Sequence, residues 1–211
     1  MRIFRIIMLL LLVATLTNCA SGYKPISPKN INYLSTNLSD SVRLDYKYGL
    51  LRKKYAKKEL KKGVKLVAIK ITNNSNRDLK FGRDAKLTYE SGDQVYIMEN
   101  QEAFKTLKQS PASYLWYLLL TPLNVYTSKT ETSNNGYYEE SSSSAFPVGL
   151  IVGPGLAGGN LIAASSANKK FKNELLQYDI NGTVIKKGET KYGLIGIYTY
   201  AFDALKLKIE K

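Results

Sequence analysis

The stretch Val64-Lys65-Leu66-Val67-Ala68-Ile69-Lys70-Ile71-Thr72 decides the fold class of this chain. It is dense in branched apolar residues, which pack well on a pleated surface and therefore favour a strand. A cluster of turn-forming residues, Asn73-Asn74-Ser75-Asn76, follows it directly. The sequence thus predicts its strongest β-strand over residues 64–72, ending in a turn.

Shorter strand patterns lie on both sides of this stretch. The last of them, Leu205–Glu210, alternates leucine and isoleucine with lysine and glutamate, which predicts one apolar and one charged face. The residues Ser91-Gly92-Asp93 separate two of the strands and indicate a hairpin. Short strands separated by turns are typical of a β-sandwich. The predicted elements are strands Val42–Tyr48, Asp84–Tyr89, Gln94–Met98, Thr183–Lys187, Lys191–Tyr200 and Leu205–Glu210, and a short helix Glu99–Lys108.

The middle of the chain breaks the strand pattern. Residues Gln109–Ser128 and Ser141–Asn168 form two segments, of 20 and 28 residues, without a formal charge. A polar loop, Lys129–Glu140, connects them and contains an Asn135-Gly136 turn. Two uncharged segments joined by a polar turn predict a helical hairpin. We therefore expect a β-sandwich made of residues 41–108 and 169–211, with a hydrophobic α-helical hairpin, residues 109–168, inserted between its halves.

The predicted hairpin fits either a bilayer or a protein partner. Each segment approaches the about 20 residues that cross a membrane. Glycines at 149 and 153, and again at 155 and 159, are spaced by four residues, which puts them on one helix face and lets another helix approach closely. Pro122, Pro147 and Pro154 argue against insertion, and a long uncharged run can also be a core element. The residues expected to contact membrane or partner are Trp116, Leu118, Gly149, Gly153, Gly155 and Gly159.

The N-terminus has the layout of an export signal. Arg2 and Arg5 precede an apolar run, Ile6–Leu16, of 11 residues, which is shorter than a membrane span. The only cysteine, Cys19, follows this run directly. Residues 20–40 are rich in Ser, Asn and Pro and predict a tether. We expect a signal peptide at residues 1–18 and a tether at residues 19–40.

Three of these patterns resemble known bacterial proteins. The segment Leu16-Thr17-Asn18-Cys19 resembles the lipobox of envelope lipoproteins of the Bacteroidota type, although Asn18 stands where Gly, Ala or Ser is usual. The resemblance implies that Cys19 is lipidated and that the protein lies on the outer membrane, with the periplasmic face expected. The pattern from Val64 to Ser75 resembles the Ig-like sandwich of many bacterial lipoproteins, and the strand pair around Ile185–Ile195 resembles the one that closes such domains. The glycine spacing is similar to that of glycine-zipper hairpins.

Composition narrows the possible functions. The chain has no histidine and one cysteine, so the commonest general base and Cys/His zinc sites are absent. Its net charge of +14, or +12 once Arg2 and Arg5 leave with the signal, suits an anionic surface. In a cell envelope that surface is a lipid membrane rather than nucleic acid. We therefore predict no enzymatic activity, no cofactor and no metal.

Two local motifs require a decision. Gly153-Pro154-Gly155-Leu156-Ala157-Gly158 matches the dinucleotide-binding pattern, but the βαβ unit that this motif requires is not predicted around it. The segment Arg52–Lys62 carries seven basic residues and one acid. It is either a surface that lies on an anionic membrane or a solvated hairpin extension between the first two strands.

These observations predict a lipid-anchored envelope protein with a non-catalytic structural or assembly-accessory role. It would contact the membrane or an envelope protein partner through the hairpin at residues 109–168. The alternative is a glycan- or lipid-binding module that uses its tyrosines or the hairpin. A third hypothesis is a hydrolase based on Ser141–Ser144 with Glu139 and Glu140. It ranks last, because activation of a serine needs an oriented base and no spacing here indicates one.

Overall fold

The computed structural model describes residues 19–132 and 139–210, which form two compact units. Residues 21–109 and 166–210 make one, here called the sheet unit. Residues 19–20, 110–132 and 139–165 make the other, here called the apolar unit. The insert predicted at residues 109–168 overlaps this second unit, which also contains residues 19–20.

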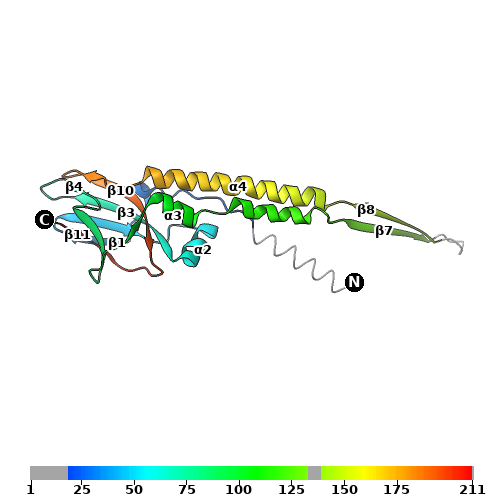
Figure 1. The fold of residues 1–211 in the computed structure, drawn as a ribbon, viewed down its shortest axis with the longest axis horizontal. Helices are drawn as coiled ribbons and strands as arrows, with labels where there is room; N and C mark the ends of the chain where they lie inside the picture. Colours follow the sequence, from blue (N-terminus) through cyan, green and yellow to red (C-terminus); the bar gives the residue numbers. More distant parts are fainter. Residues whose placement is uncertain (1–18, 133–138, 211) are drawn as a thin grey trace. The chain divides into compact units, whose positions relative to one another are not determined.

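The sheet unit is built on five antiparallel strands in the order β1-β2-β3-β10-β6 (Figure 1). Its central strand, β3 (Val64–Asn73), contains the apolar stretch of residues 64–72 that predicts the strongest strand. Hydrogen bonding with β10 pairs Val67 with Ile195 and Ile69 with Gly193. Nearly every residue of β3 is buried, because both faces of the sheet are covered. The other strands are β1 (Ser35–Ser39), β2 (Val42–Lys47), β6 (Ile97–Met98) and β10 (Thr190–Tyr198).

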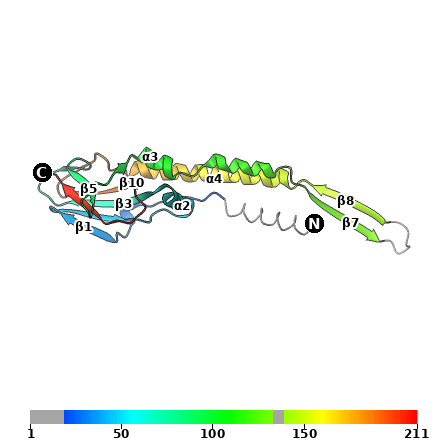
Figure 2. The ribbon, with the colours of Figure 1, turned by 60° about the horizontal axis from the view of Figure 1, so that its bottom comes forward.

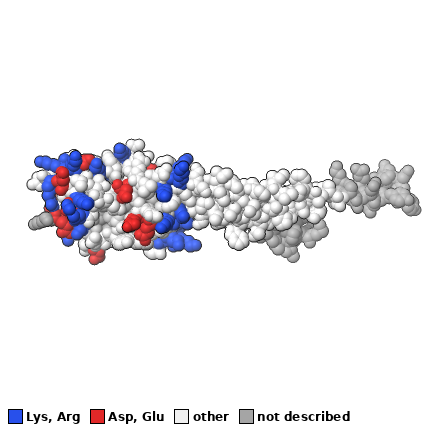
Figure 3. All heavy atoms as spheres, turned by 45° about the horizontal axis from the view of Figure 1, so that its top comes forward, with Lys and Arg blue, Asp and Glu red and all other residues white. Residues whose placement is uncertain are grey.

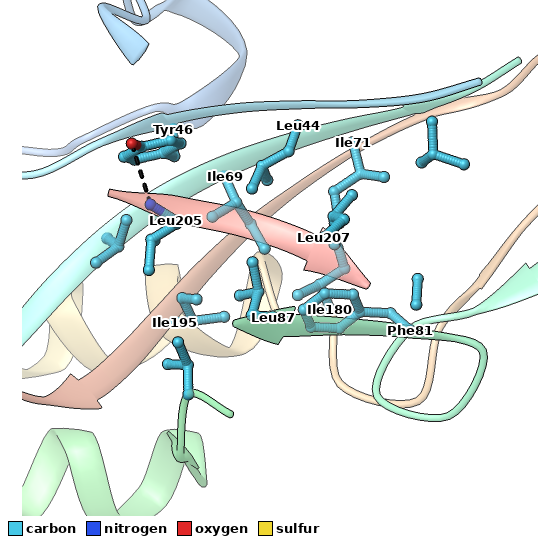
Figure 4. Packing of buried hydrophobic residues seen from close by; sticks show 14 of the residues in the cluster. Leu44, Tyr46, Ile69, Ile71, Phe81, Leu87, Ile180, Ile195, Leu205 and Leu207 are labelled. Atoms are coloured by element: carbon cyan, nitrogen blue, oxygen red, sulfur yellow. Dashed lines mark hydrogen bonds between the residues drawn. The ribbon is translucent and has the colours of Figure 1, made fainter. Parts of the chain in front are cut away.

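Two small sheets cover one face of the five-stranded sheet. They pair β11 (Leu205–Ile209) with β5 (Ala85–Tyr89), and β4 (Leu79–Lys80) with β9 (Val184–Ile185). Figure 4 shows the apolar side chains between these layers and the hydrogen bond that Leu205 N–H donates to Tyr46 Oη at 3.1 Å. The main members of this core are Leu44, Ile69, Ile71, Phe81, Leu87, Ile180, Ile195 and Leu207.

Helices cover the opposite face of the five-stranded sheet. Figure 2 shows α3 (Asn100–Leu107) next to β10. Two further helices, α2 (Lys53–Lys62) and the residues of α4 (Gly149–Gln177) beyond 165, complete this layer. A second core lies between them and the sheet, made of Tyr23, Tyr55, Leu66, Met98, Ala103, Leu107, Phe171, Leu175 and Leu194.

Most strands predicted in the sheet unit are confirmed to within a few residues, and so is helix α3. The hairpin at Ser91-Gly92-Asp93 forms its turn, where Gly92 N–H donates to Tyr89 O at 3.0 Å. Val95 N–H still bonds to Leu87 O at 3.0 Å, but β6 then pairs with β10 rather than with β5. The second strand of that hairpin therefore leaves its partner and joins the larger sheet.

The basic segment Arg52–Lys62 is a helix rather than a hairpin extension. Tyr55 and Glu59 are spaced by four residues, so they share one helical face, and both are buried. Gly63 ends the helix with a left-handed backbone (φ 61°), and its N–H bonds to Glu59 O. The lysines of α2 occupy the remaining faces.

The apolar unit differs from the predicted pair of α-helices. Its first uncharged segment forms a 3-10 helix, η2 (Pro111–Leu120), and only the second segment is α-helical, within α4. The connection is a β-hairpin of β7 (Val125–Thr132) and β8 (Glu139–Phe146), paired from Val125 with Phe146 to Thr132 with Glu139. The predicted Asn135-Gly136 turn lies outside the described residues. The fold therefore combines antiparallel sheets with one long helix.

Candidate membrane-contact unit

The 3-10 helix η2 presents one aromatic face to α4. A 3-10 helix has three residues per turn, so Tyr114, Tyr117 and Leu120 lie one above another. Tyr114 and Tyr117 are buried, and their rings stack with centroids 6.3 Å apart and planes 9° apart. They pack against Ala157 and Ala164 of α4. This narrow seam is the core of the apolar unit.

Two of the four predicted glycines stand where α4 meets the η2 segment. A Cβ at Gly153 would lie 2.8 Å from Thr121 Oγ1, closer than real Cβ atoms come, and 3.2 Å from Tyr117 O, which is a tight contact. A Cβ at Gly149 would collide with the backbone of Leu120 and Thr121. Small residues at 149 and 153 therefore permit the close approach of the two segments.

The other two predicted glycines point into open space. A Cβ added at Gly155 or at Gly159 would meet no atom within 4 Å in the described structure. The four glycines thus divide into a pair inside the seam and a pair on the outer surface of α4.

Outside the seam, the apolar unit exposes large hydrophobic side chains. Trp116 is 73% exposed and Leu118 is 44% exposed, so both predicted contact residues face outward. Residues 110–128 and 141–165 carry no charge, and in Figure 3 the described parts of these segments are white. α4 is long and apolar enough to cross a membrane by length and composition, a test that buried core helices also pass. Further exposed residues are Leu115, Leu119, Tyr126, Phe146, Leu150, Ile151 and Ile162.

The residue predicted to carry lipid belongs to this same unit. Cys19 lies close enough to Tyr114 and Tyr117 to interact electrostatically with both. The next residue is fixed on α4, because Ala20 N–H donates to Asn160 Oδ1, while Asn160 Nδ2 donates to Leu156 O at 2.8 Å. Cys19 is thus held beside the aromatic seam. The predicted signal peptide, residues 1–18, lies outside the described residues.

A buried polar cluster in the sheet unit lies where the chain passes between the units, near residues 21, 109 and 166. We call Ser21, Gln109, Asn168 and Tyr55 the junction. Gln109 Oε1 accepts from Ser21 N–H at 3.0 Å, and Gln109 N–H donates to Asn168 Oδ1 at 2.9 Å. Asn168 Nδ2 donates to Gln109 O at 3.0 Å, and Tyr55 Oη donates to Asn168 Oδ1 at 3.0 Å. Ser21, Gln109 and Asn168 are therefore held together at one place.

The segment predicted as a tether is docked along much of its length. Glu174 accepts hydrogen bonds from Tyr23 Oη, from Ile26 N–H at 2.8 Å and from Ser27 N–H at 3.0 Å. Tyr23 is buried against Tyr55 and Phe171, and β1 occupies Ser35–Ser39. The composition predicts a loose linker, but the backbone N–H groups of Ile26 and Ser27 bind the buried carboxylate of Glu174.

Parts of the other sequence motifs can be located in the described structure, whereas the side chains of Glu139, Glu140, Ser141 and Ser142 lie outside it. Gly153–Gly158 lies inside α4 rather than in a loop between a strand and a helix. Ser144 lies on β8, where its Oγ is 2.9 Å from Thr127 Oγ1. No group of three His, Cys, Asp or Glu residues that could hold a metal ion occurs within residues 19–132 and 139–210.

One hollow of the sheet unit bears on the alternative of ligand binding. It encloses about 460 Å³ and is lined by Leu34, Tyr46, Tyr48 and Phe202, among others. The rings of Tyr48 and Phe202 meet edge to face, with centroids 5.5 Å apart and planes at 88°. Lys65 Nζ lies 4.2 Å from the Phe202 centroid. The two rings are therefore perpendicular and do not form a flat platform.

Comparison with known proteins finds no matching family model, no similar curated protein and no similar solved structure.

Proposed function

We propose that this protein is a lipid-anchored protein of the bacterial envelope with a non-catalytic structural role, and that its apolar unit enters the bilayer. One observation carries the proposal. The apolar unit has a small buried core around Tyr114 and Tyr117, leaves large apolar side chains such as Trp116 and Ile151 exposed, and holds Cys19–Ala20 through the hydrogen bond of Ala20 to Asn160. A lipid on Cys19 and the apolar side chains would then enter the same membrane.

The dimensions of the apolar unit fit this role. The part of α4 that belongs to the apolar unit, residues 149–165, is a helix of 17 residues. At about 1.5 Å per residue it measures about 25 Å, close to the thickness of the hydrocarbon core of about 30 Å. Between the two uncharged segments, the sequence carries charge at Lys129, Glu131, Glu139 and Glu140. If both segments cross the membrane, these charges reach the opposite water interface.

The exposed apolar side chains are better covered by lipid than by water. Large apolar patches on a protein that stays in water are rare and mark an interaction surface. A bilayer covers such side chains on every exposed side of η2 and α4 at once, whereas a protein partner must match their shape. A single acyl chain binds a membrane weakly, and a second membrane contact makes attachment stable.

The location follows from the sequence. The signal-like residues 1–18 and the lipobox-like Cys19 favour the outer membrane, with the sheet unit on the periplasmic face. We further propose that the sheet unit is an Ig-like sandwich, since its antiparallel sheets pack face to face around one core. The runner-up function is a glycan-binding module that uses the hollow beside Tyr48 and Phe202.

Lipidation is tested by feeding cells labelled palmitate. We expect the wild-type chain to incorporate the label and Cys19→Ala to lose it, whereas Ser21→Ala, a change two residues away, keeps it. Equal labelling of Cys19→Ala and wild type would refute lipidation at this residue.

Bilayer entry is tested separately, without the lipid. Residues 19–211 carrying Cys19→Ala are transferred from detergent into vesicles whose acyl chains are brominated. Trp116, the chain's only tryptophan, should be quenched by the bromine and protected from acrylamide in the water. If acrylamide quenches Trp116 equally with and without vesicles, the apolar unit does not enter lipid, and a protein partner becomes the better candidate.

A further inference from the structure

Lysines from three elements of the sheet unit come together on its helical side. Lys108, directly after α3, and Lys172, on α4, both place their ammonium groups over the ring of Phe104, at 5.6 and 5.9 Å from its centroid. Both lysines are exposed. Phe104 packs against the core that α2, α3 and α4 share, and α2 is in contact with α3.

The end of α2 adds three more positive charges to this place. Burial lowers the pKa of Lys58, and the neighbouring charges of Lys62, Lys108 and Lys61 lower it further. We call Lys58, Lys61, Lys62, Lys108 and Lys172 the basic cluster. Lys58 lies close enough to Lys61, Lys62 and Lys108 to be repelled by them, and Lys172 shares the Phe104 ring with Lys108. Such repulsion costs free energy unless anions are bound.

The protein itself supplies little neutralisation. In the described part of the chain, no acidic side chain lies within 4.0 Å of any ammonium group of the basic cluster. The nearest acid along α2, Glu59, faces inward, where its Oε1 accepts Leu66 N–H at 2.8 Å. Glu102 of α3 is engaged with Tyr198 Oη at 2.8 Å. The positive charge of the cluster is therefore available to an external anion.

Two lysines of the basic cluster also flank the uncharged segments in the sequence: Lys108 precedes the first segment and Lys172 follows the second. Lys108 immediately precedes Gln109 of the junction, and Lys172 follows Asn168 of the junction by four residues of helix, or about 6 Å. If residues 110–165 enter the hydrocarbon, these two lysines lie at the depth of the lipid headgroups. This position distinguishes them from the other lysines of the sheet unit.

We propose that the basic cluster binds the phosphates of anionic phospholipid headgroups around the point where the apolar unit enters the membrane. The inference rests on the proposed bilayer entry and adds to it a preference for anionic lipid. Each lysine near an anionic surface strengthens binding about fivefold. Three of them therefore contribute about 100-fold, which is enough to set where the sheet unit rests.

The test uses residues 19–211 with Cys19→Ala, and the emission of Trp116 as the signal of binding. Vesicles of phosphatidylcholine alone, or with phosphatidylglycerol mixed in, are titrated into the protein. We expect tighter binding to the anionic vesicles, and this preference should weaken as salt is added. The triple variant Lys61→Gln, Lys62→Gln, Lys108→Gln should lose about 100-fold in affinity for anionic vesicles and little for neutral ones.

A second triple variant provides the matched control. Lys80→Gln, Lys186→Gln, Lys187→Gln removes the same charge from exposed positions at β4 and after β9, and should retain the preference for anionic vesicles. Equal losses in both triple variants, or no preference in the unaltered chain, would overturn the assignment of this site. If Trp116 responds to neither kind of vesicle, bilayer entry itself is refuted, so the two failures are distinguishable. Circular dichroism checks that each variant is folded.

Discussion

At the scale of single residues, the polar side chains of the uncharged region have specific tasks. Asn160 fixes Ala20 on α4, while Gln109 and Asn168 hold the junction together. The sequence interpretation assigned no role to them, because spacing along one chain does not reveal which distant amides meet. One signal was present nevertheless, since two asparagines interrupt an otherwise apolar helical segment at 160 and 168.

The junction predicts a large effect for one asparagine. Asn168→Ala removes the side chain that Gln109 N–H, Gln109 O and Tyr55 Oη contact, and with it three buried hydrogen bonds of the junction. We expect the sheet unit to lose about 2–4 kcal/mol of unfolding free energy, measured by denaturant titration in mild detergent. Asn173→Ala, an exposed position on the same helix, is the control and should change stability by less than about 0.5 kcal/mol. Equal effects would show that the junction is not stabilising.

At the scale of elements, periodicity predicted the sheet unit well and the apolar unit only in part. The apolar residues of β3 and β11 follow patterns that fit only a strand, because they match the faces that the core covers. For η2 the same apolar content fits both helix types, and only the burial of Tyr114 and Tyr117 reveals the three-residue repeat. The helix α2 was not predicted, because most of its residues are lysines and its buried face consists of Tyr55 and Glu59 alone.

The two kinds of glycine on α4 predict opposite effects of the same change. Gly149→Ala places a methyl group against the backbone of Leu120 and Thr121 and should weaken the packing of η2 by about 1–3 kcal/mol. Gly159→Ala meets open space and removes a flexible residue from a helix, which should stabilise it by about 0.5–1 kcal/mol. Thermal unfolding in micelles, followed by the near-ultraviolet signal of Trp116, measures both. Destabilisation of equal size in the two variants would contradict this division.

At the scale of the whole molecule, each unit has a core of its own. The sheet unit buries two clusters on the two faces of its main sheet, and the apolar unit buries only its seam. The boundaries were predictable because charge disappears abruptly at 109 and returns at 169. The docking of the N-terminal segment was not, because it depends on one carboxylate, Glu174, far away in the sequence.

The sheet unit should therefore fold without the apolar unit. Gln109 and Asn168 are already hydrogen bonded to each other, so a short Gly-Ser linker can replace residues 110–165. Produced from Ser21 onward, this chain should remain soluble without detergent and unfold in one cooperative transition. Analytical ultracentrifugation and circular dichroism provide the measurement. A chain that aggregates or lacks a cooperative transition would show that the sheet unit needs the insert.

The docking of residues 21–27 has a mechanical consequence. A free linker of 20 residues would let a lipid-anchored domain wander by roughly 25 Å from its anchor. Here only Cys19 and Ala20 precede the junction, and Ala20 is itself bound to Asn160. If Cys19 carries lipid, almost no flexible linker separates the lipid from the sheet unit. A lipid at Cys19 would then keep Ser21 of the sheet unit within two residues of the bilayer, so the lipid would restrict how far the sheet unit can move from the membrane surface.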